Sequence, residues 1–172
     1  NTFGLYADGL ILRVNDHKTI MNASKLSHLP VINALSNLSH PCQCLAGLMT
    51  LLEERGSLEK LNIVWMGPIT NVANSWIEAF KKELGFSINI FCPETWFEKY
   101  RKKMKEYDIS IDLDGIIHHQ INDQILAQAD AVMTDTWKSM GEDIKRQDYD
   151  LIKEFRVTEK IMQKTKSDSI FM

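Results

Sequence analysis

Two short polar runs contain the side chains best suited to bind a small charged molecule. His40-Pro41-Cys42-Gln43 opens a predicted helix, and the run from Asp135 to Gly141 (Asp-Thr-Trp-Lys-Ser-Met-Gly) follows a short apolar strand. The unpaired N–H groups and positive dipole end of a helix start favour an anion or a polarised carbonyl. The first run therefore predicts an anion or carbonyl site, and the second predicts a site for an amino-acid head group.

Two further polar residues follow predicted strands. Arg13 ends the first apolar strand, and Asn71 follows the strand that stops at Gly67. Ligands of open parallel sheets bind at the carboxyl ends of the strands, so we expect these residues to share a site with His40 and Gln43. An imidazole, a carboxamide and a guanidinium together would stabilise a carbonyl that develops negative charge.

The long helix over 41–55 is the element that must position the first run. A residue before proline disfavours the α region, so His40 should lie just outside the helix, and Pro41 suits its first position. Gly56 supplies the C-terminal stop. Four apolar residues recur at helical spacing and predict the buried face: Leu45, Leu48, Met49 and Leu52.

The rest of the chain alternates between predicted strands and helices. Strands are expected over 9–14, 31–32, 61–66, 86–92, 109–113, 131–134 and 169–172. Helices are expected over 17–28, 71–84, 95–107, 121–129 and 158–164. This alternation predicts an α/β fold with a doubly wound parallel sheet, Rossmann-like after residue 57. Residues 1–36 hold too few elements to close a sheet, and both ends read as interrupted, so we expect the middle part of a longer protein.

Composition excludes several classes of protein. The 172 residues are 44% hydrophobic and 25% charged, with a formal charge of −3, which predicts a globular protein without attraction to nucleic acid. No apolar run approaches the roughly 20 residues of a membrane span. Three cysteines without a Cys-x-x-Cys pair, and no visible signal peptide, favour a reducing, cytoplasmic location.

Purely structural roles are open for each candidate residue. His40 could be only a helix cap, and so could Asp135 or Asn71. The neighbours of these residues favour binding: Gln43 stands one turn after His40, and Ser-Met-Gly follows Asp135.

Other charged groups have plainer interpretations. Arg13 could pair on the surface with Asp8 or Asp16. The basic run over 99–105 is offset by nearby glutamates, so a solvated helix face is expected rather than a nucleic-acid site. His118-His119 would point to opposite sides of a strand, so they are not expected to share a metal ion.

In their order along the chain, these runs resemble the aspartate/ornithine carbamoyltransferase family. The resembling segments are Ala7-Asp8-Gly9-Leu10-Ile11-Leu12-Arg13, Pro30-Val31-Ile32-Asn33-Ala34-Leu35-Ser36, His40-Pro41-Cys42-Gln43, Trp65-Met66-Gly67, Asn71-Val72-Ala73-Asn74-Ser75, Ala129-Asp130-Ala131, Thr134-Asp135-Thr136-Trp137 and Ser139-Met140-Gly141. His-Pro-x-Gln is common to the superfamily, whereas Asp-x-Trp-x-Ser-Met-Gly is specific to the ornithine branch.

The resemblance implies a set of residues that contact carbamoyl phosphate. They are Arg13, His40, Pro41, Cys42 and Gln43. Of these, Arg13 and His40 would polarise the carbonyl and are the implied catalytic residues.

The resemblance also implies how L-ornithine is held. Asn71 and the backbone of Met140 would bind its α-carboxylate, and Asp135 and Ser139 its α-amino group. The δ-amine would attack the carbamoyl carbon and yield citrulline and phosphate, a step of arginine biosynthesis or of a urea cycle. Neither a metal nor another cofactor is implied, because the chemistry needs positioning and oxyanion stabilisation.

The family pattern also predicts domains and assembly. Residues 1–36 would be the C-terminal part of a carbamoyl-phosphate domain, 37–56 a connecting helix, and 57–172 an ornithine-binding domain truncated at its C-terminus. The complete protein would be a homotrimer whose partners are its two substrates.

This chain departs from the family pattern in three places. The family's Ser-Thr-Arg-Thr loop would lie upstream of residue 1, and its His-Cys-Leu-Pro segment would lie downstream of residue 172. Gly67-Pro68-Ile69-Thr70 stands where relatives carry Gly-Asp before an asparagine pair. The alternatives are therefore a carbamoyltransferase for aspartate, acetylornithine or putrescine, or a non-catalytic remnant that binds an amino acid or serves in assembly.

Overall fold

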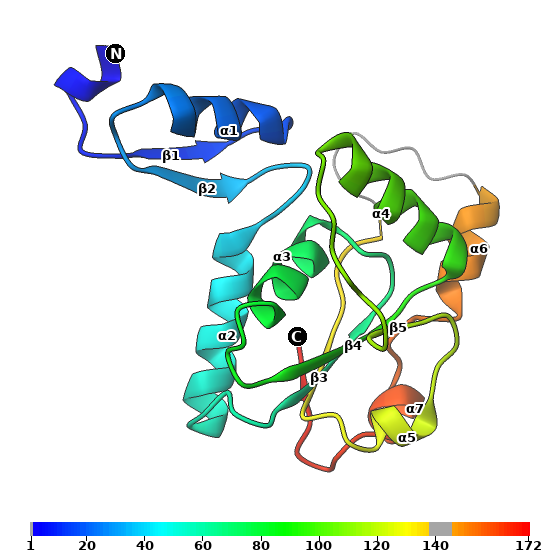
Figure 1. The fold of residues 1–172 in the computed structure, drawn as a ribbon. Helices are drawn as coiled ribbons and strands as arrows, with labels where there is room; N and C mark the ends of the chain where they lie inside the picture. The colour runs from blue at the N-terminus through cyan, green and yellow to red at the C-terminus, as the bar shows by residue number, and fades with distance from the viewer. Residues whose placement is uncertain (1, 138–145) are drawn as a thin grey trace.

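A computed structural model describes residues 2–137 and 146–172 of the chain, and their strands and helices alternate as predicted (Figure 1). The strands are β1 (Leu10–Arg13), β2 (Val31–Leu35), β3 (Asn62–Met66), β4 (Ser87–Phe91), β5 (Ile117–His118), β6 (Ala131–Met133) and β7 (Ile170–Phe171). The helices are the 3-10 turn η1 (Thr2–Leu5), α1 (His17–Leu26), α2 (Pro41–Arg55), α3 (Asn71–Phe80), α4 (Glu94–Glu106), α5 (Asp123–Leu126), α6 (Arg146–Lys153) and α7 (Glu159–Met162). Helix α6 is absent from the sequence prediction.

The described strands form two parallel sheets, which confirms the α/β class. β1 and β2 pair with each other and, with α1, make the first lobe. The second lobe is a five-stranded sheet in the order β5-β4-β3-β6-β7. Helix α2 links the lobes and runs along one side of the second (Figure 1).

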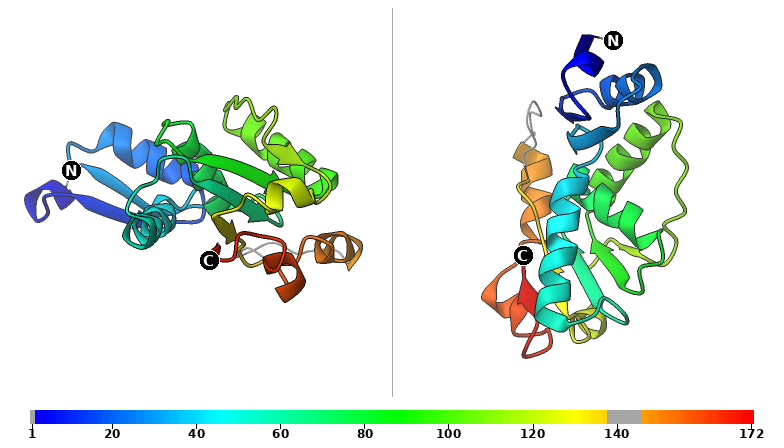
Figure 2. Two further views of the ribbon diagram at one scale, coloured as in Figure 1. Left: turned by 90° about the horizontal axis from the view of Figure 1, so that it is seen from below. Right: turned by 90° about the vertical axis from the view of Figure 1, so that its left-hand side faces the viewer.

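The core of the second lobe lies on both faces of its sheet. Along β3, Ile63 and Trp65 point into the cluster that packs under α2, α3 and α4, whereas Val64 and Met66 point into the cluster under α5 and α7. Figure 2 shows α4 and α7 on opposite faces of the sheet. Because successive side chains of a strand alternate between faces, a sheet covered on both sides needs unbroken apolar strands.

The buried face of α2 differs from the predicted one. Leu45, Met49 and Leu52 are 63%, 61% and 48% exposed. The buried side chains are Cys44, Leu48 and Leu51. Helix α2 is apolar on two faces, and its spacing alone does not tell which face packs against α3. The predicted stop is confirmed, because Gly56 has a φ of 74° and its N–H donates to the Leu52 carbonyl.

The predicted strand over 109–113 is wrong: this segment is a loop, and the edge strand is β5 instead. Asp108 already turns the chain with a φ of 56°, and the Asp112 carboxylate accepts a hydrogen bond from the Asp114 N–H. Gly115 turns it again with a φ of 79°. The alternating apolar side chains of 109–113 therefore pack against α4, and the backbone of this segment does not pair with β4. Alternation in the sequence cannot distinguish these two arrangements.

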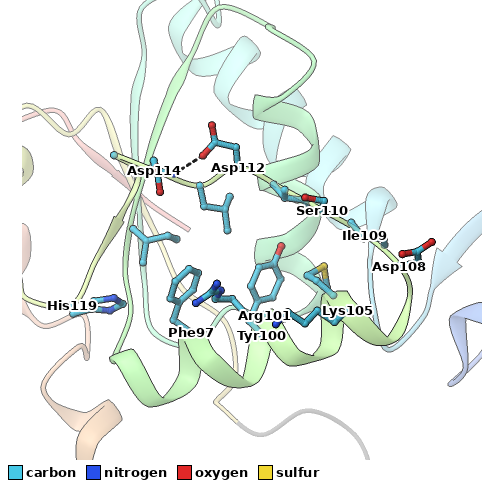
Figure 3. Close-up of a pocket in the computed structure, with 15 residues that line it drawn as sticks. Phe97, Tyr100, Arg101, Lys105, Asp108, Ile109, Ser110, Asp112, Asp114 and His119 are labelled. Carbon is cyan, nitrogen blue, oxygen red and sulfur yellow. Dashed lines mark hydrogen bonds between the residues drawn. The ribbon is translucent and has the colours of Figure 1, made fainter.

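A cavity of about 630 Å³ lies between this loop and α4. Figure 3 shows Phe97, Tyr100 and Arg101 of the helix on one side and Asp112 and Asp114 of the loop on the other. The residues that line it include none of the predicted site residues.

The two lobes make direct hydrogen bonds. The Tyr107 hydroxyl at the end of α4 exchanges hydrogen bonds with the Asn37 carboxamide at 3.0 and 3.1 Å, and Lys103 Nζ donates to the Asn37 carbonyl at 2.6 Å. Asn71 Nδ2 donates to the Ser36 carbonyl at 2.8 Å. These contacts fix how the first lobe faces the second.

Candidate active site

A second cavity, of about 340 Å³, lies between the lobes at the carboxyl ends of their strands. It is lined by Arg13, Asn15, Leu35, Ser36, Asn37, His40, Gln43, Asn71, Val72, Lys103, Thr134, Asp135 and Thr136. Its volume is within the range of small-molecule sites. Five of the predicted residues, from four separate segments, therefore meet in one cleft: Arg13, His40, Gln43, Asn71 and Asp135.

His40 occupies the N-cap position of α2, but its side chain does not cap the helix. The backbone holds it in place, since its N–H donates to Ser75 Oγ at 2.8 Å. Nδ1 of the ring is buried and has no hydrogen-bond partner among the described residues. The capping alternative is therefore excluded, and within the described residues Nδ1 is not committed to another hydrogen bond.

Charges on both walls of the cleft act on the His40 ring. Burial lowers the pKa of His40 below its ordinary value of 6.5, and the Arg13 guanidinium lowers it further. The Asp135 carboxylate opposes them and raises the pKa. The net shift is downward, so the ring is neutral at neutral pH. A neutral imidazole can donate one N–H to a carbonyl oxygen without carrying a charge.

Arg13 and Gln43 complete this end of the cleft. Arg13 is the last residue of β1, and within the described residues its guanidinium makes no ion pair or hydrogen bond. Asp16, one of its predicted surface partners, instead caps α1 by accepting from the Lys18 N–H. Gln43 stands in the first turn of α2, and its N–H donates to the His40 carbonyl at 3.1 Å. A guanidinium and a carboxamide thus face the same space as the imidazole.

Asn71 is the first residue of α3, and it is not the cap of that helix. Thr70 is the N-cap and accepts from the Ala73 N–H. One N–H of the Asn71 carboxamide is used on the Ser36 carbonyl. A carboxamide carries two N–H donors, so the second can donate to an anion in the cleft.

Asp135 lies two residues beyond β6 and is held on both carboxylate oxygens. Oδ2 accepts from the Thr70 hydroxyl at 2.9 Å, and Oδ1 accepts from the Thr136 N–H at 2.7 Å. Within the described part of the chain Asp135 caps no helix. Each oxygen has a further lone pair, so the carboxylate can still accept from a ligand ammonium.

Two of the predicted contact residues lie away from the cleft. Pro41 and Cys42 do not line the cleft, and the exposed Cys42 thiol donates to the Asn33 carbonyl at 3.5 Å. Ser139 and Met140 lie outside the described residues.

Sequence reasoning missed Lys103, which it assigned to the solvated face of α4. The side chain lines the cleft and reaches across to the Asn37 carbonyl of the first lobe. Lys103 falls at helical spacing from Tyr100, which is buried, and from Tyr107, which contacts the first lobe. That spacing was the available signal, but the surrounding charges obscured it.

The two adjacent histidines have separate hydrogen-bond partners. His118 Nε2 lies 2.8 Å from Asn89 Oδ1, and His119 Nδ1 donates to the Cys92 carbonyl at 3.0 Å. Within the described residues, no three His, Cys, Asp or Glu side chains are grouped so that they could hold a metal ion. None of the described helices combines the length and apolar composition needed to cross a bilayer.

The cleft therefore separates its charges. His40, Arg13 and Gln43 offer hydrogen-bond donors at the end of α2, and Asp135 offers acceptors on the opposite wall. Such a site can bind one anionic, carbonyl-bearing molecule beside one cationic molecule. It can also stabilise negative charge on a carbonyl oxygen.

Comparison with known proteins finds family models that match both parts of the chain. Residues 1–53 match the family model "aspartate/ornithine carbamoyltransferase, carbamoyl-P binding domain", and residues 59–172 match its "Asp/Orn binding domain". The chain is 36% identical over 170 residues to the ornithine carbamoyltransferase of Thermococcus kodakarensis, an alignment that covers 97% of this chain and 53% of that protein.

Solved structures agree with this match. The ornithine carbamoyltransferase of Pyrococcus furiosus superimposes with a TM-score of 0.81 at 32% identity, over 99% of this chain and 55% of that one. The aspartate transcarbamoylase of Trypanosoma cruzi shares the fold, with a TM-score of 0.67 at 19% identity. The chain thus spans about half the length of the curated relatives it matches.

Proposed function

The chain belongs to the aspartate/ornithine carbamoyltransferase family, and we propose that the whole protein transfers the carbamoyl group of carbamoyl phosphate to L-ornithine. The products are L-citrulline and phosphate. One observation carries the proposal beyond family membership: a single cleft holds the Arg13 and His40 donors on one side and the Asp135 carboxylate on the other. Each half of that cleft matches one substrate.

Carbamoyl phosphate is assigned to the end of the cleft at α2. The start of the helix and the Arg13 guanidinium favour the negatively charged phosphate. His40 and Arg13 donate to the carbonyl oxygen, and Gln43 helps to orient the carbamoyl group. Pro41 and Cys42 stay part of the proposed contact set on the strength of the family motif alone.

Ornithine is assigned to the wall formed by the start of α3 and the segment after β6. The Asp135 carboxylate accepts from the α-ammonium, and the spare N–H of Asn71 donates to the α-carboxylate. Ser139 and the Met140 backbone complete this proposed set. Held at its α-carbon, the amino acid extends its side chain toward the carbamoyl group.

The reaction is an addition followed by an elimination. The neutral δ-amine of ornithine attacks the carbamoyl carbon, and the new C–N bond places negative charge on the carbonyl oxygen. His40 and Arg13 stabilise that oxygen. The C–O bond to phosphate then breaks, phosphate leaves with the bonding electrons, and the nitrogen loses a proton. Holding two substrates in line supplies much of the rate enhancement.

The remaining proposals concern the larger protein. Residues 1–36 belong to its carbamoyl-phosphate domain, 37–56 form the connecting helix, and 57–172 belong to its ornithine domain. The full protein is a homotrimer of the cytoplasm and acts in arginine biosynthesis. A relative from Pyrococcus furiosus is named as an anabolic ornithine carbamoyltransferase, which supports the biosynthetic direction of the reaction.

The decisive experiment offers the full-length protein carbamoyl phosphate with each of four amines. Ornithine should give citrulline with a kcat/KM well above the values for aspartate, acetylornithine and putrescine. A preference for another acceptor would overturn the choice of amine. Calorimetry with both substrates runs alongside, since binding without turnover would favour a non-catalytic amino-acid-binding protein.

A further inference from the structure

Thr70 lies in the turn where this chain departs from the family pattern, and its hydroxyl makes two bonds. It accepts from the Ala73 N–H at 3.3 Å, which caps α3, and it donates to Asp135 Oδ2 at 2.9 Å. The side chain is 8% exposed and does not line the cleft. One hydroxyl therefore joins the start of α3 to the segment after β6 from behind the site.

We propose that Thr70 is a positioning residue for ornithine: its hydroxyl holds the Asp135 carboxylate in the orientation that receives the substrate ammonium. The inference rests on the proposed function. Thr70 touches no substrate, so it acts only through Asp135. Asn71, the next residue along the chain, binds the other end of the amino-acid head group.

The turn that carries Thr70 is held by its own hydrogen bonds. Trp65 Nε1 donates to the Pro68 carbonyl at 2.9 Å, and the Thr70 N–H donates to the same carbonyl at 3.0 Å. Gly67 adopts a φ of 120°, which a side chain rarely permits. These bonds within the turn define where the Thr70 hydroxyl lies.

The segment that carries Asp135 is attached at a second point. Thr134 Oγ1 donates to the Met66 carbonyl at 2.7 Å, which joins the ends of the neighbouring strands β6 and β3. Thr134 thus fixes the backbone just before Asp135, and Thr70 fixes its carboxylate. Without the bond from Thr70, the Thr136 N–H is the one remaining restraint on the carboxylate among the described residues, so its rotation is opposed there on one oxygen instead of two.

A carboxylate held in advance binds an ammonium more tightly, because less rotational freedom is lost on binding. Removing the hydroxyl should therefore weaken ornithine binding and leave carbamoyl phosphate binding alone. An effect on ornithine binding alone distinguishes this role from a general loss of structure, because a general loss of structure would weaken the binding of both substrates.

The test uses the full-length protein and three variants at threonines. Thr70→Val keeps the shape and removes the hydroxyl, and it should raise the KM for ornithine roughly tenfold, the size expected for a hydrogen bond to a charged group. The KM for carbamoyl phosphate and the kcat should stay within about twofold. Thr70→Ser keeps the hydroxyl and should restore the KM.

The third variant controls for the lost helix cap. Thr158→Val removes an equivalent cap, on α7, far from the cleft. It should lower the melting temperature to a similar extent without changing the KM for ornithine. An equal rise in KM for Thr158→Val, or no rise for Thr70→Val, would overturn the proposal.

A double-mutant cycle tests whether Thr70 acts through Asp135. In an Asp135→Ala background, Thr70→Val should have no further effect on the KM for ornithine. A full additional tenfold loss would show that Thr70 works by another route. If the unaltered protein forms no citrulline, the proposed function itself fails. The free energies of unfolding of the unaltered protein, the two single variants and the double variant then test the hydrogen bond between Thr70 and Asp135. Additive changes would show that the two side chains do not interact. Non-additive changes would show that they interact without a role in ornithine binding.

Discussion

The imidazole of His40, at the start of α2, and the carboxylate of Asp135, beyond β6, act on each other across one cleft, although they belong to elements far apart in the sequence. Asp135 raises the pKa of His40 against the larger effect of burial and the effect of Arg13. This relationship ties the carbonyl end of the site to its amino-acid end. It also makes the electrostatics of the cleft measurable before any substrate is added.

The pKa of His40 should respond in opposite directions to changes on the two walls. Asp135→Asn removes the charge that raises it, so the pKa should fall further below 6.5. Arg13→Gln removes a charge that lowers it, so the pKa should rise. NMR titration of the ring protons in the full-length protein measures both shifts. His17, whose pKa is lowered by its own burial, serves as the internal reference and should not move. Equal shifts of both rings, or shifts with reversed signs, would contradict the assignment.

Asp135→Ala should reduce kcat/KM for ornithine by roughly tens to hundreds of fold, because a charge-assisted bond to the substrate ammonium is lost. Steady-state kinetics at saturating carbamoyl phosphate measure the change. Asp123→Ala is the matched control, since that exposed carboxylate pairs with Lys164 away from the cleft. An unchanged dependence on ornithine would remove Asp135 from the site.

His40→Ala should lower kcat by about a hundredfold or more, the usual effect of removing one oxyanion donor. Its melting temperature should stay close to that of the unaltered protein, because the ring caps no helix and its Nδ1 makes no bond within the described residues. His28→Ala removes an exposed imidazole and serves as the control. A large loss of thermal stability with normal turnover would show a structural role instead.

Acid should weaken the contact between Asp130 and Lys166. Burial alone would raise the pKa of Asp130, but the Lys166 ammonium, the Asn62 N–H and the Arg55 guanidinium together lower it. The stabilisation is therefore complete above pH 3.8 and is lost as the pH falls through the lowered value.

Lys166→Met should reduce the free energy of unfolding at pH 7 by roughly 1 kcal/mol, a modest amount because the lysine is partly exposed. The difference from the unaltered protein should shrink below pH 3.8. Urea denaturation at several pH values checks it, with Lys164→Met at an exposed pair as the control. A difference that stays constant down to the lowest pH would contradict the linkage.

Local patterns in the sequence predicted most of the elements. Pro41 and Gly56 mark the ends of α2 correctly, since backbone conformation at those residues depends on their own side chains. The apolar runs of β3 and β4 identify buried parallel strands, and the alternation of strands with helices predicts the α/β class. These features depend on near neighbours along the chain.

The tertiary structure determines the features that depend on residues far apart in the sequence. The packing of α3 determines which apolar face of α2 is buried, and α4 draws 109–113 into a loop. Lys103 lines the cleft and donates to the Asn37 carbonyl, a contact between residues far apart in the sequence.

The site divides in the same way. The sequence alone identified His40 and Asp135, because helix starts and strand ends display polar groups. Only the folded chain shows that they share a cleft and that the hydroxyl of Thr70 stands behind Asp135. Hydrogen bonds between residues remote in sequence leave no periodic pattern to read, since their geometry exists only in the folded chain.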